Sequence, residues 1–293
     1  MSVNRQTRGL LAGLSASALW GGMYVVSKAV LEVIPPFSLL SSRLLLGALA
    51  LAIWLLLRRR WPHLGRREWI GALGVGMLGY GASLGMQFTG TKLSTAANGA
   101  VVTAATPVFV YLFAWLLLRE RIPGWRWAAL ALSTLGVLLV IDPAQARLSP
   151  DLWLGNLILV AAALSWALYS VLVRRNTQQI GVLAFTLIAL LGGLLVSLPL
   201  AAWEMAQAPL GALGWGTLAG VLYLGLAATA LGAFLWNYAF ETLEAGQAAL
   251  TFFAQPLVGA LLGALLLGEM LGSLFLAGTA LILLGLLISA RQK

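Results

Sequence analysis

The sequence predicts an all-α integral membrane protein of ten transmembrane helices, arranged as two inverted five-helix repeats with both termini in the cytoplasm. Three observations carry this prediction. First, 61% of the 293 residues are hydrophobic and only 9% are charged, whereas an ordinary soluble domain has about 25% charged residues. Second, ten apolar runs of near-spanning length follow one another. Third, one sequence phrase occurs twice with the same spacing of proline and glutamate.

Each apolar run is interpreted as one helix, because a span needs about 20 residues. No stretch between the runs is long or polar enough to form a soluble domain, so we expect one integrated membrane domain with halves at 1–145 and 146–293. The first run is too long for a typical secretory signal core and is closely followed by a second span. The ten runs are residues 9–31, 37–57, 69–89, 96–118, 124–141, 152–173, 181–203, 211–236, 245–267 and 271–289.

The basic residues set the orientation. The net charge is +9, and 14 of the 18 basic residues fall on the N-terminal side when successive helix ends are assigned to alternate sides. Lys28, Lys92 and Arg147 fall on the other side, and Arg43 lies inside a span. This asymmetry is the positive-inside pattern, which places both termini in the cytoplasm. The basic excess therefore needs no nucleic-acid partner.

The repeated phrase predicts the internal symmetry. It reads TPVFVYLFAWLLLRE at 106–120 and QPLVGALLGALLLGE at 255–269, an offset of 149 residues that Gly136 and Gly285 also keep. Five helices per half is an odd number, so the second half enters the membrane from the opposite face. Glu120 is then cytoplasmic and Glu269 is outside, which is the inverted repeat of many secondary transporters. The alternative is chance similarity between Leu- and Ala-rich helices.

The phrases belong to longer patterns, NGAVVTAATPVFVYLFAWLLLRERI and AGQAALTFFAQPLVGALLGALLLGEML, with a tryptophan-bearing opening helix, SASALWGGMYVVSK, and an arginine-bearing second helix, SLLSSRLLLGAL. This ordered set resembles the drug/metabolite transporter superfamily, in its ten-helix branch with two EamA-type halves, over essentially the whole chain. Within that branch the chain is similar to the YddG-type amino acid exporters. The resemblance implies export of amino acids, drugs or other small metabolites, and a cavity lined by the first, third and fourth helices of each half.

Polar residues deep in the spans are the candidates for this cavity, because hydrocarbon gives them no partner. The duller alternatives are helix packing for Ser and Thr and interfacial anchoring for Trp, although Trp20 and Trp166 lie too deep for anchoring. Further polar positions at this depth are Thr106, Ser165, Ser170, Tyr223, Thr229, Tyr238 and Thr251. The candidate cavity residues are Ser17, Trp20, Tyr24, Tyr80, Ser83, Gln87, Asn98, Thr103, Trp166, Tyr169, Trp236, Asn237, Gln247 and Gln255.

Three residues are assigned gating or structural roles. Pro107 and Pro256 lie near the centres of their spans, where a proline removes one helical N–H and disturbs the preceding turn. They are expected to kink the fourth and ninth helices and to shape the cavity, with simple packing as the alternative. Arg43 is the one clearly intramembrane charge, and such a charge must snorkel, pair or face water. We expect Arg43 to be structural or gating, with substrate binding as the alternative.

The residues that are missing also restrict function. No Asp or Glu lies well inside any predicted span, so a carboxylate proton relay has no obvious residue, and we expect uniport or coupling by an unfamiliar route. The chain has no cysteine and its one histidine, His63, lies in a basic loop. Without a Walker loop, a paired-acid metal site or a Ser–His pair, we expect no ATP hydrolysis, no enzyme activity, no metal and no cofactor.

The sequence therefore predicts a multi-pass protein of a bacterial inner membrane that exports small organic metabolites, in particular neutral and aromatic amino acids, by alternating access. Its expected partners are a small-molecule substrate and the lipid bilayer. A monomer is expected to suffice for transport, and a dimer stays open. The alternatives are a multidrug or other metabolite exporter on the same scaffold, or a passive solute channel.

Overall fold

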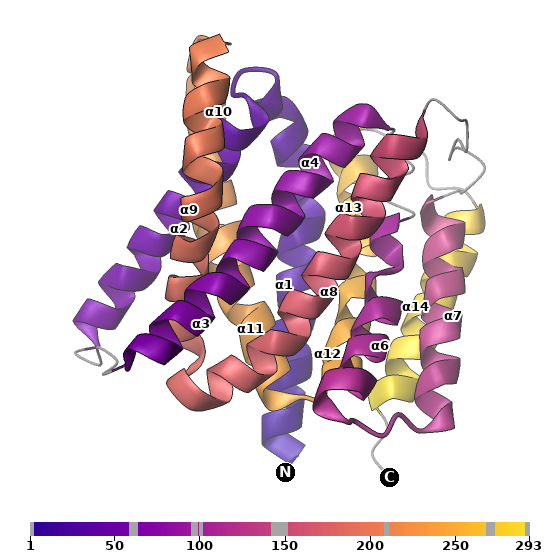
Figure 1. Ribbon diagram of the computed structural model, residues 1–293. Helices are drawn as coiled ribbons and strands as arrows, with labels where there is room; N and C mark the ends of the chain where they lie inside the picture. The colour runs from indigo at the N-terminus through magenta and orange to yellow at the C-terminus, as the bar shows by residue number, and fades with distance from the viewer. Residues whose placement is uncertain are drawn as a thin grey trace.

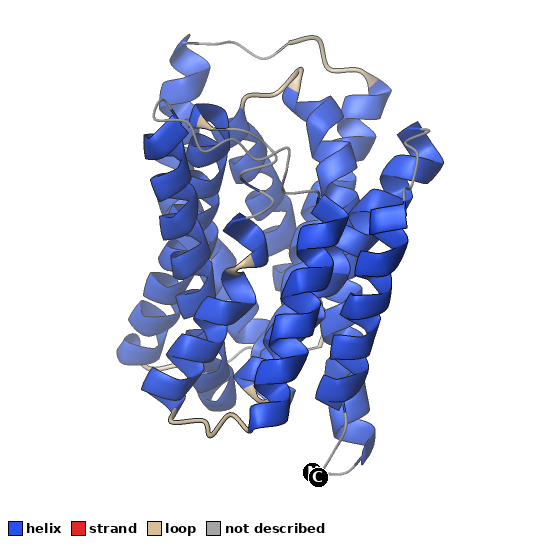
Figure 2. Ribbon diagram, turned by 90° about the vertical axis from the view of Figure 1, so that its right-hand side faces the viewer, coloured by secondary structure: helices blue, strands red, loops and turns tan. Residues whose placement is uncertain are grey.

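The computed structural model describes residues 3–58, 64–94, 99, 102–141, 152–207, 211–267 and 273–290. These residues form helices joined by short loops, with no strand among them (Figure 2). Six helices are long and apolar enough to cross a membrane, and three shorter apolar helices accompany them. The chain is thus an all-helical membrane protein, and the crossing of the membrane by all ten predicted spans stays a prediction.

The helices follow the predicted runs, and one or more described helices overlap each of the ten. The eighth run differs most, since its helix begins at Trp215 rather than at 211 and continues to Thr242. The first predicted half contains α1 (Val3–Leu31), α2 (Pro36–Leu57), α3 (Arg66–Gly76), η1 (Met77–Ser83), α4 (Leu84–Leu93), α6 (Thr106–Leu118) and α7 (Gly124–Ile141). The second contains α8 (Trp153–Ile180), α9 (Val182–Gln207), α10 (Trp215–Leu222), η4 (Tyr223–Leu231), α11 (Gly232–Thr242), α12 (Ala245–Leu250), η5 (Thr251–Phe253), α13 (Ala254–Leu267) and α14 (Ser273–Ala290).

Local residues account for several helix ends. Pro36 lies in the first turn of α2, where a proline lacks no hydrogen bond that the helix needs. Glu68 accepts a hydrogen bond from the Gly65 N–H at 2.7 Å and so closes the first turn of α3. Gly181, with φ of 82°, ends α8 in a backbone conformation that suits glycine.

Two long helices contain π-helical segments. The helix of residues 66–93 is interrupted by η1, and the helix of residues 215–242 is interrupted by η4. A π-helical segment leaves one residue out of the regular i→i−4 hydrogen-bond pattern, and such segments are frequent at functional sites. In both segments the backbone therefore departs from the ideal α-helix, and helix formation alone does not account for this departure.

Several corresponding elements of the two predicted halves share an offset of 149 residues at their ends. Helices α7 and α14 differ by 149 residues at both ends (273 − 124 and 290 − 141). The two π-interrupted helices also differ by 149 at both ends (215 − 66 and 242 − 93), and α6 and α13 end 149 residues apart (267 − 118). The offset that proline and glutamate keep in the sequence is thus also kept by helix boundaries.

Helix packing comes in matched sets. Helix α1 packs on α11 and α13, and α8 packs on α4 and α6, while α2 packs on α9 and α7 packs on α14. Gly136 of α7 lies against Gly278 of α14, and Ala129 lies against Gly285. Because the residue numbers run in opposite directions along this contact, α7 and α14 are antiparallel. The glycines allow the two backbones to approach closely, as small residues do in membrane helices.

The outer surface of the bundle is apolar. Large hydrophobic side chains such as Leu57, Trp215 and Leu265 are more than three-quarters exposed, which suits contact with lipid rather than water. The buried residues form one main core that joins helices of both predicted halves. Helix α1 begins and α14 ends at the same end of the bundle (Figure 1), and so the two chain ends lie on one side of the molecule.

Candidate functional site

A cavity lies between helices of both predicted halves. Its volume is about 60 Å³, which is room for several water molecules. The wall is mostly apolar and aromatic, with a few hydroxyl and amide groups and one cation, as in many small-molecule sites. The residues that line it are Trp20, Met23, Arg43, Tyr80, Ser83, Leu84, Gln87, Thr103, Thr106, Leu159, Ala162, Ala163, Trp166, Ala228, Thr229, Ala233, Phe252 and Gln255.

Aromatic rings form one side of the wall. The ring of Trp20 on α1 lies 5.7 Å from that of Trp166 on α8, edge to face, and 6.2 Å from that of Phe252. Tyr80 contacts Trp166 at 5.7 Å. Edge-to-face contacts of this kind stabilise the arrangement beyond the area that the rings bury. The Trp20 indole N–H also donates a hydrogen bond to the Ala228 carbonyl at 2.8 Å, which fixes the ring against the second half.

The two π-helical segments both reach the cavity. Tyr80 and Ser83 belong to η1, and Ala228 and Thr229 belong to η4. The Ser83 hydroxyl donates to the Ala162 carbonyl at 2.8 Å and joins η1 to α8 across the wall. The departures from regular helix noted above therefore place side chains at the cavity, one segment from each half.

The two prolines also lie close to residues of the cavity wall. Pro107 is in the first turn of α6, and Pro256 is in the first turn of α13, directly after a 3₁₀ segment. A proline cannot donate to the carbonyl four residues before it, and here those residues are Thr103 and Phe252, which both line the cavity. Each proline thus interrupts its helix beside the wall, and its role in gating stays a prediction.

Eight of the seventeen predicted site and gating residues line the cavity, namely Trp20, Arg43, Tyr80, Ser83, Gln87, Thr103, Trp166 and Gln255. Gln255 is 5% exposed, and its side-chain oxygen has no hydrogen-bond partner in the described part of the chain. The structure thus brings these residues together around one space. Their binding of a solute stays a prediction.

Other predicted residues lie behind the wall rather than on it. The Tyr169 hydroxyl is hydrogen-bonded to the Tyr80 hydroxyl at 3.0 Å and to the Asn237 side-chain oxygen at 2.9 Å, and Asn237 donates to Thr186. The Trp236 indole N–H is directed at the Ser170 hydroxyl at 3.3 Å. These buried groups satisfy one another, so their position supports the wall. Ser17 and Gln247 are also buried and do not line the cavity. Asn98 and the side chain of Tyr24 lie outside the described residues.

Ion pairs join the predicted halves at one end of the bundle. Glu120, just after α6, pairs with Arg174 of α8 at 2.9 Å and accepts a hydrogen bond from the Ala245 N–H, which begins α12. Arg126 of α7 pairs with Glu244. We call these four charged residues the closed end.

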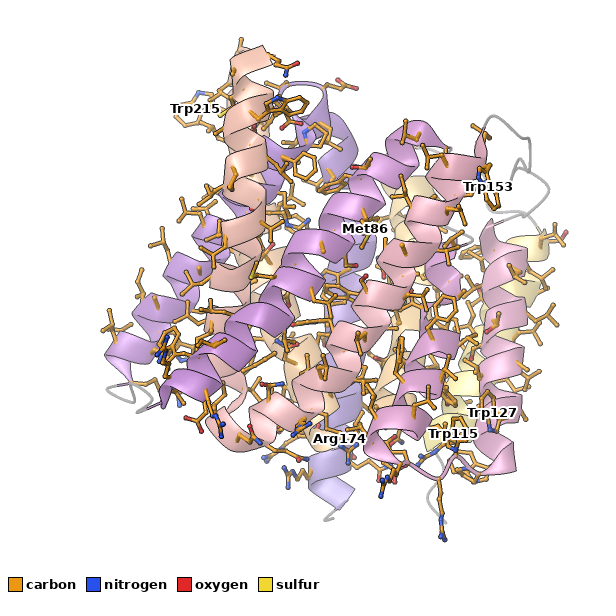
Figure 3. All side chains as sticks on the ribbon, in the orientation of Figure 1. Met86, Trp115, Trp127, Trp153, Arg174 and Trp215 are labelled. Atoms are coloured by element: carbon orange, nitrogen blue, oxygen red, sulfur yellow. The ribbon has the colours of Figure 1, made fainter. Side chains whose placement is uncertain are left out.

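The cavity and the closed end lie at different heights. Figure 3 shows Arg174 at the end of the bundle where α1 begins, Trp153 near the opposite end, and Met86, the neighbour of the cavity residue Gln87, between them. Trp166 at the cavity and Arg174 at the closed end are eight residues apart on α8, about 12 Å at 1.5 Å per residue. Buried aromatic residues, including Tyr169 and Trp236, occupy the intervening layer.

Sequence reasoning missed the apolar part of the wall. Leu159, Ala162, Ala163 and Ala233 carry no chemical signal, because a small apolar residue on a membrane helix is ordinary. Thr229 stood among the polar positions but not among the candidate site residues, although it contacts Arg43. In the described residues no group of three or more His, Cys, Asp or Glu could hold a metal ion.

Comparisons with known proteins agree with this architecture. The EamA-like transporter family matches the chain twice, over residues 7–142 and 153–291. A probable amino-acid metabolite efflux pump of Salmonella typhimurium is 29% identical over 96% of this chain and 94% of its own length. An uncharacterized transporter of Archaeoglobus fulgidus is 25% identical over 94% and 95%. A solved crystal structure that is 20% identical superposes with a TM-score of 0.82 over 96% of both chains, which shows a shared fold.

The two family matches together span nearly the whole sequence, and the relatives are matched over almost their full lengths. The all-helical fold and the apolar outer surface fit a membrane protein of this kind. The chain therefore belongs to the EamA-like transporter family and is a multi-pass membrane transporter of small molecules.

Proposed function

We propose that the protein exports amino acids, including neutral and aromatic ones, by alternating access across a bacterial inner membrane. The observation that carries this proposal is the cavity, whose wall is built from both halves of the chain and combines aromatic rings with neutral polar groups and one arginine. Such a wall suits a solute that is neutral or zwitterionic overall and has an apolar side chain. The Salmonella relative is described as a probable amino-acid metabolite efflux pump, which supports both the substrate class and the direction.

Alternating access needs two halves that can move against each other, and several features support an inverted pair of five-helix units. The family matches the chain twice, helix boundaries recur at the offset of 149 residues, and α7 and α14 meet in antiparallel contact. Inverted halves that enclose a site near the bilayer centre are the usual basis of carriers that rock about that site. The basic excess on the side of the chain ends supports cytoplasmic termini.

The closed end supports a conformational cycle with a defined barrier on one side. Both of its ion pairs join residues 1–145 to residues 146–293, so separating the halves at this end breaks both. The buried aromatic layer above them would part in the same step. In this proposal the structure is the state that is closed on the cytoplasmic side, and the inward-facing state forms when Glu120 leaves Arg174 and the start of α12.

The test is counterflow in proteoliposomes that contain the purified protein. Unlabelled L-phenylalanine inside the vesicles should drive transient uptake of labelled L-phenylalanine above the equilibrium level, because a carrier must return its site through one solute or the other. A passive channel gives no such overshoot. Equilibration without counterflow would contradict alternating access. Absence of flux for every amino acid, with flux for a drug or a nucleoside, would contradict the substrate class and leave the carrier mechanism intact.

A further inference from the structure

Arg43 differs in kind from every other residue of the cavity wall. It is 6% exposed, it lies on the apolar helix α2, and among the described residues that line the cavity it is the only charged one. No Asp or Glu is among the described residues that line this space. The cavity therefore carries a net positive charge, and this feature is not explained by a transporter of solutes that are neutral at every group.

Thr229 holds the guanidinium in one orientation. The Arg43 Nε–H donates to the Thr229 Oγ1 at 2.8 Å, and the Thr229 hydroxyl donates in turn to the Leu224 carbonyl at 2.7 Å within η4. The hydroxyl hydrogen is thus already used, so Thr229 offers Arg43 an acceptor whose direction is fixed. The π-helical segment of the second half in this way positions an arginine of the first half.

The rest of the guanidinium has no hydrogen-bond or ion-pair partner among the described residues. Arginine has five N–H donors in a planar fork, and only the Nε–H of Arg43 is hydrogen-bonded among the described residues. The edge formed by the two terminal nitrogens remains, and this edge matches the two oxygens of a carboxylate in a bidentate pair. A cation buried in a membrane protein without an anionic partner is unfavourable, so an anion from the solute would supply what the protein does not.

We infer that the cavity recognises solutes through a carboxylate, which binds the two terminal nitrogens of Arg43, with Thr229 as a positioning residue. This inference rests on the proposed transport function and narrows its substrate class. The apolar part of the solute packs on the Trp20 and Trp166 rings. An ammonium group finds no acid among the described residues of the wall, so the carboxylate dominates recognition and the amine contributes little.

The inference separates compounds that otherwise look alike. L-Phenylalanine and 3-phenylpropionate both carry the carboxylate, whereas L-phenylalaninamide and phenethylamine lack it. Binding to the purified full-length protein is measured by quenching of tryptophan fluorescence and by the ligand-induced shift in melting temperature. L-Alanine, acetate and their amides extend the panel to smaller solutes. Each acid should bind the wild type more tightly than its amide, and 3-phenylpropionate should bind about as well as L-phenylalanine.

Three variants test the role of Arg43 and Thr229. Arg43→Gln should weaken binding of the acids by about 10- to 100-fold, the range expected for loss of a charge-assisted pair. Arg43→Lys should recover part of it, because a lysine keeps the charge but not the fork. Thr229→Val keeps the charge of Arg43 and removes the fixed hydrogen-bond acceptor of its Nε–H. It should therefore reduce the ratio of the affinity for each acid to the affinity for its amide. If Arg43→Gln does not fold, the lysine and valine variants still decide the question by this ratio.

The outcomes distinguish this inference from the transport function beneath it. Wild-type protein that binds amides or amines as well as the acids, with affinities that Arg43→Gln leaves unchanged, would overturn the inference. Counterflow of those same amines would show that the carrier function stands without it. Conversely, acid binding that depends on Arg43, in protein that shows no counterflow of any solute, would contradict the carrier and support the carboxylate site.

Discussion

Arg174 and Arg43 are both arginines on long apolar helices, but the structure gives them different surroundings. Arg174 pairs with Glu120 at 2.9 Å and also donates to the Leu243 carbonyl, at the end of the bundle. Arg43 is more deeply buried, and among the described residues its one hydrogen-bond partner is the neutral Thr229. The closed end thus supplies an anion to its cation, and the cavity does not.

The difference distinguishes protein charges that stabilise the fold from protein charges that interact with the solute. A charge that has a protein partner stabilises the conformation in which the partner is near. A buried charge without one lowers stability in the absence of solute and favours a state in which an anion is bound. We therefore expect changes at the closed end to act on stability and on the balance of conformations, and changes at Arg43 to act on recognition.

The largest expected effect is at Trp20, which lies in the cavity wall. Trp20→Ala removes ring contacts with Trp166 and Phe252 and the hydrogen bond to the Ala228 carbonyl. Replacing a buried tryptophan by alanine lowers stability by about 3–5 kcal/mol. The melting temperature in detergent should fall sharply and counterflow should be lost. Trp20→Phe keeps most of the ring and should retain the fold with reduced flux. An alanine variant with normal flux would remove Trp20 from the wall.

The second largest effect on stability is expected at the contact between Gly76 and helix α9. A Cβ at Gly76, directly before η1, would lie 2.1 Å from the Ala189 carbonyl oxygen, which is backbone of α9. Gly76→Ala must move α3 away from α9, and overpacking of this kind lowers stability by about 1–3 kcal/mol. Gly74→Ala is the matched control, because a Cβ there meets nothing within 4 Å. Equal melting temperatures for the two variants would contradict the tight contact.

A smaller effect is expected when the closed end loses its cation. Arg174→Gln leaves Glu120 half-paired, and because Arg174 is 25% exposed the loss should be about 1–2 kcal/mol after solvent screening. Adding Glu120→Gln should restore part of it, so the double variant is more stable than the sum of the single effects implies. Arg175→Gln, at an exposed neighbour, is the control and should change nothing. Additive effects of the two changes would show that the pair does not couple the halves.

The smallest effect on stability is expected at Arg43. Without solute, Arg43→Gln loses one hydrogen bond to Thr229 but also removes an unpaired buried cation. The free energy of unfolding should therefore change by less than about 1 kcal/mol. This result would contrast with Arg174→Gln. A larger destabilisation at Arg43 than at Arg174 would mean that Arg43 is structural, as the sequence alone suggested.

The sequence predicts the framework well because hydrocarbon enforces it. Apolar runs must be helical, and a proline must interrupt its helix, so the places of α7 and of Pro107 follow directly from residue type. Depth also identifies Trp20, Tyr80 and Trp166 as residues near a polar space. These properties belong to single residues or single helices, and a sequence shows them without knowledge of neighbours.

The partners of each residue could not be predicted in the same way. Tyr169, three residues after Trp166 on α8, is also buried. Its hydroxyl, however, is hydrogen-bonded to Tyr80 and Asn237 and does not line the cavity. Thr229 gains its importance only from the approach of α2. The predicted repeat also gives no guide to the ion pairs, because the residue 149 positions before Arg174 is Val25. The offset of 149 residues thus relates helix boundaries and does not relate this arginine to a second one.

The central claim is that the two halves are inverted around the cavity, and the direction of α7 and α14 tests it most directly. The chain has no cysteine, so Gly124→Cys and Ser273→Cys, at the exposed starts of these two helices, can be introduced singly. In intact cells a membrane-impermeant thiol reagent should label position 273 from outside and leave position 124 unlabelled until the cells are opened. Labelling of both positions from the same side would contradict the inverted arrangement and the alternating access built on it.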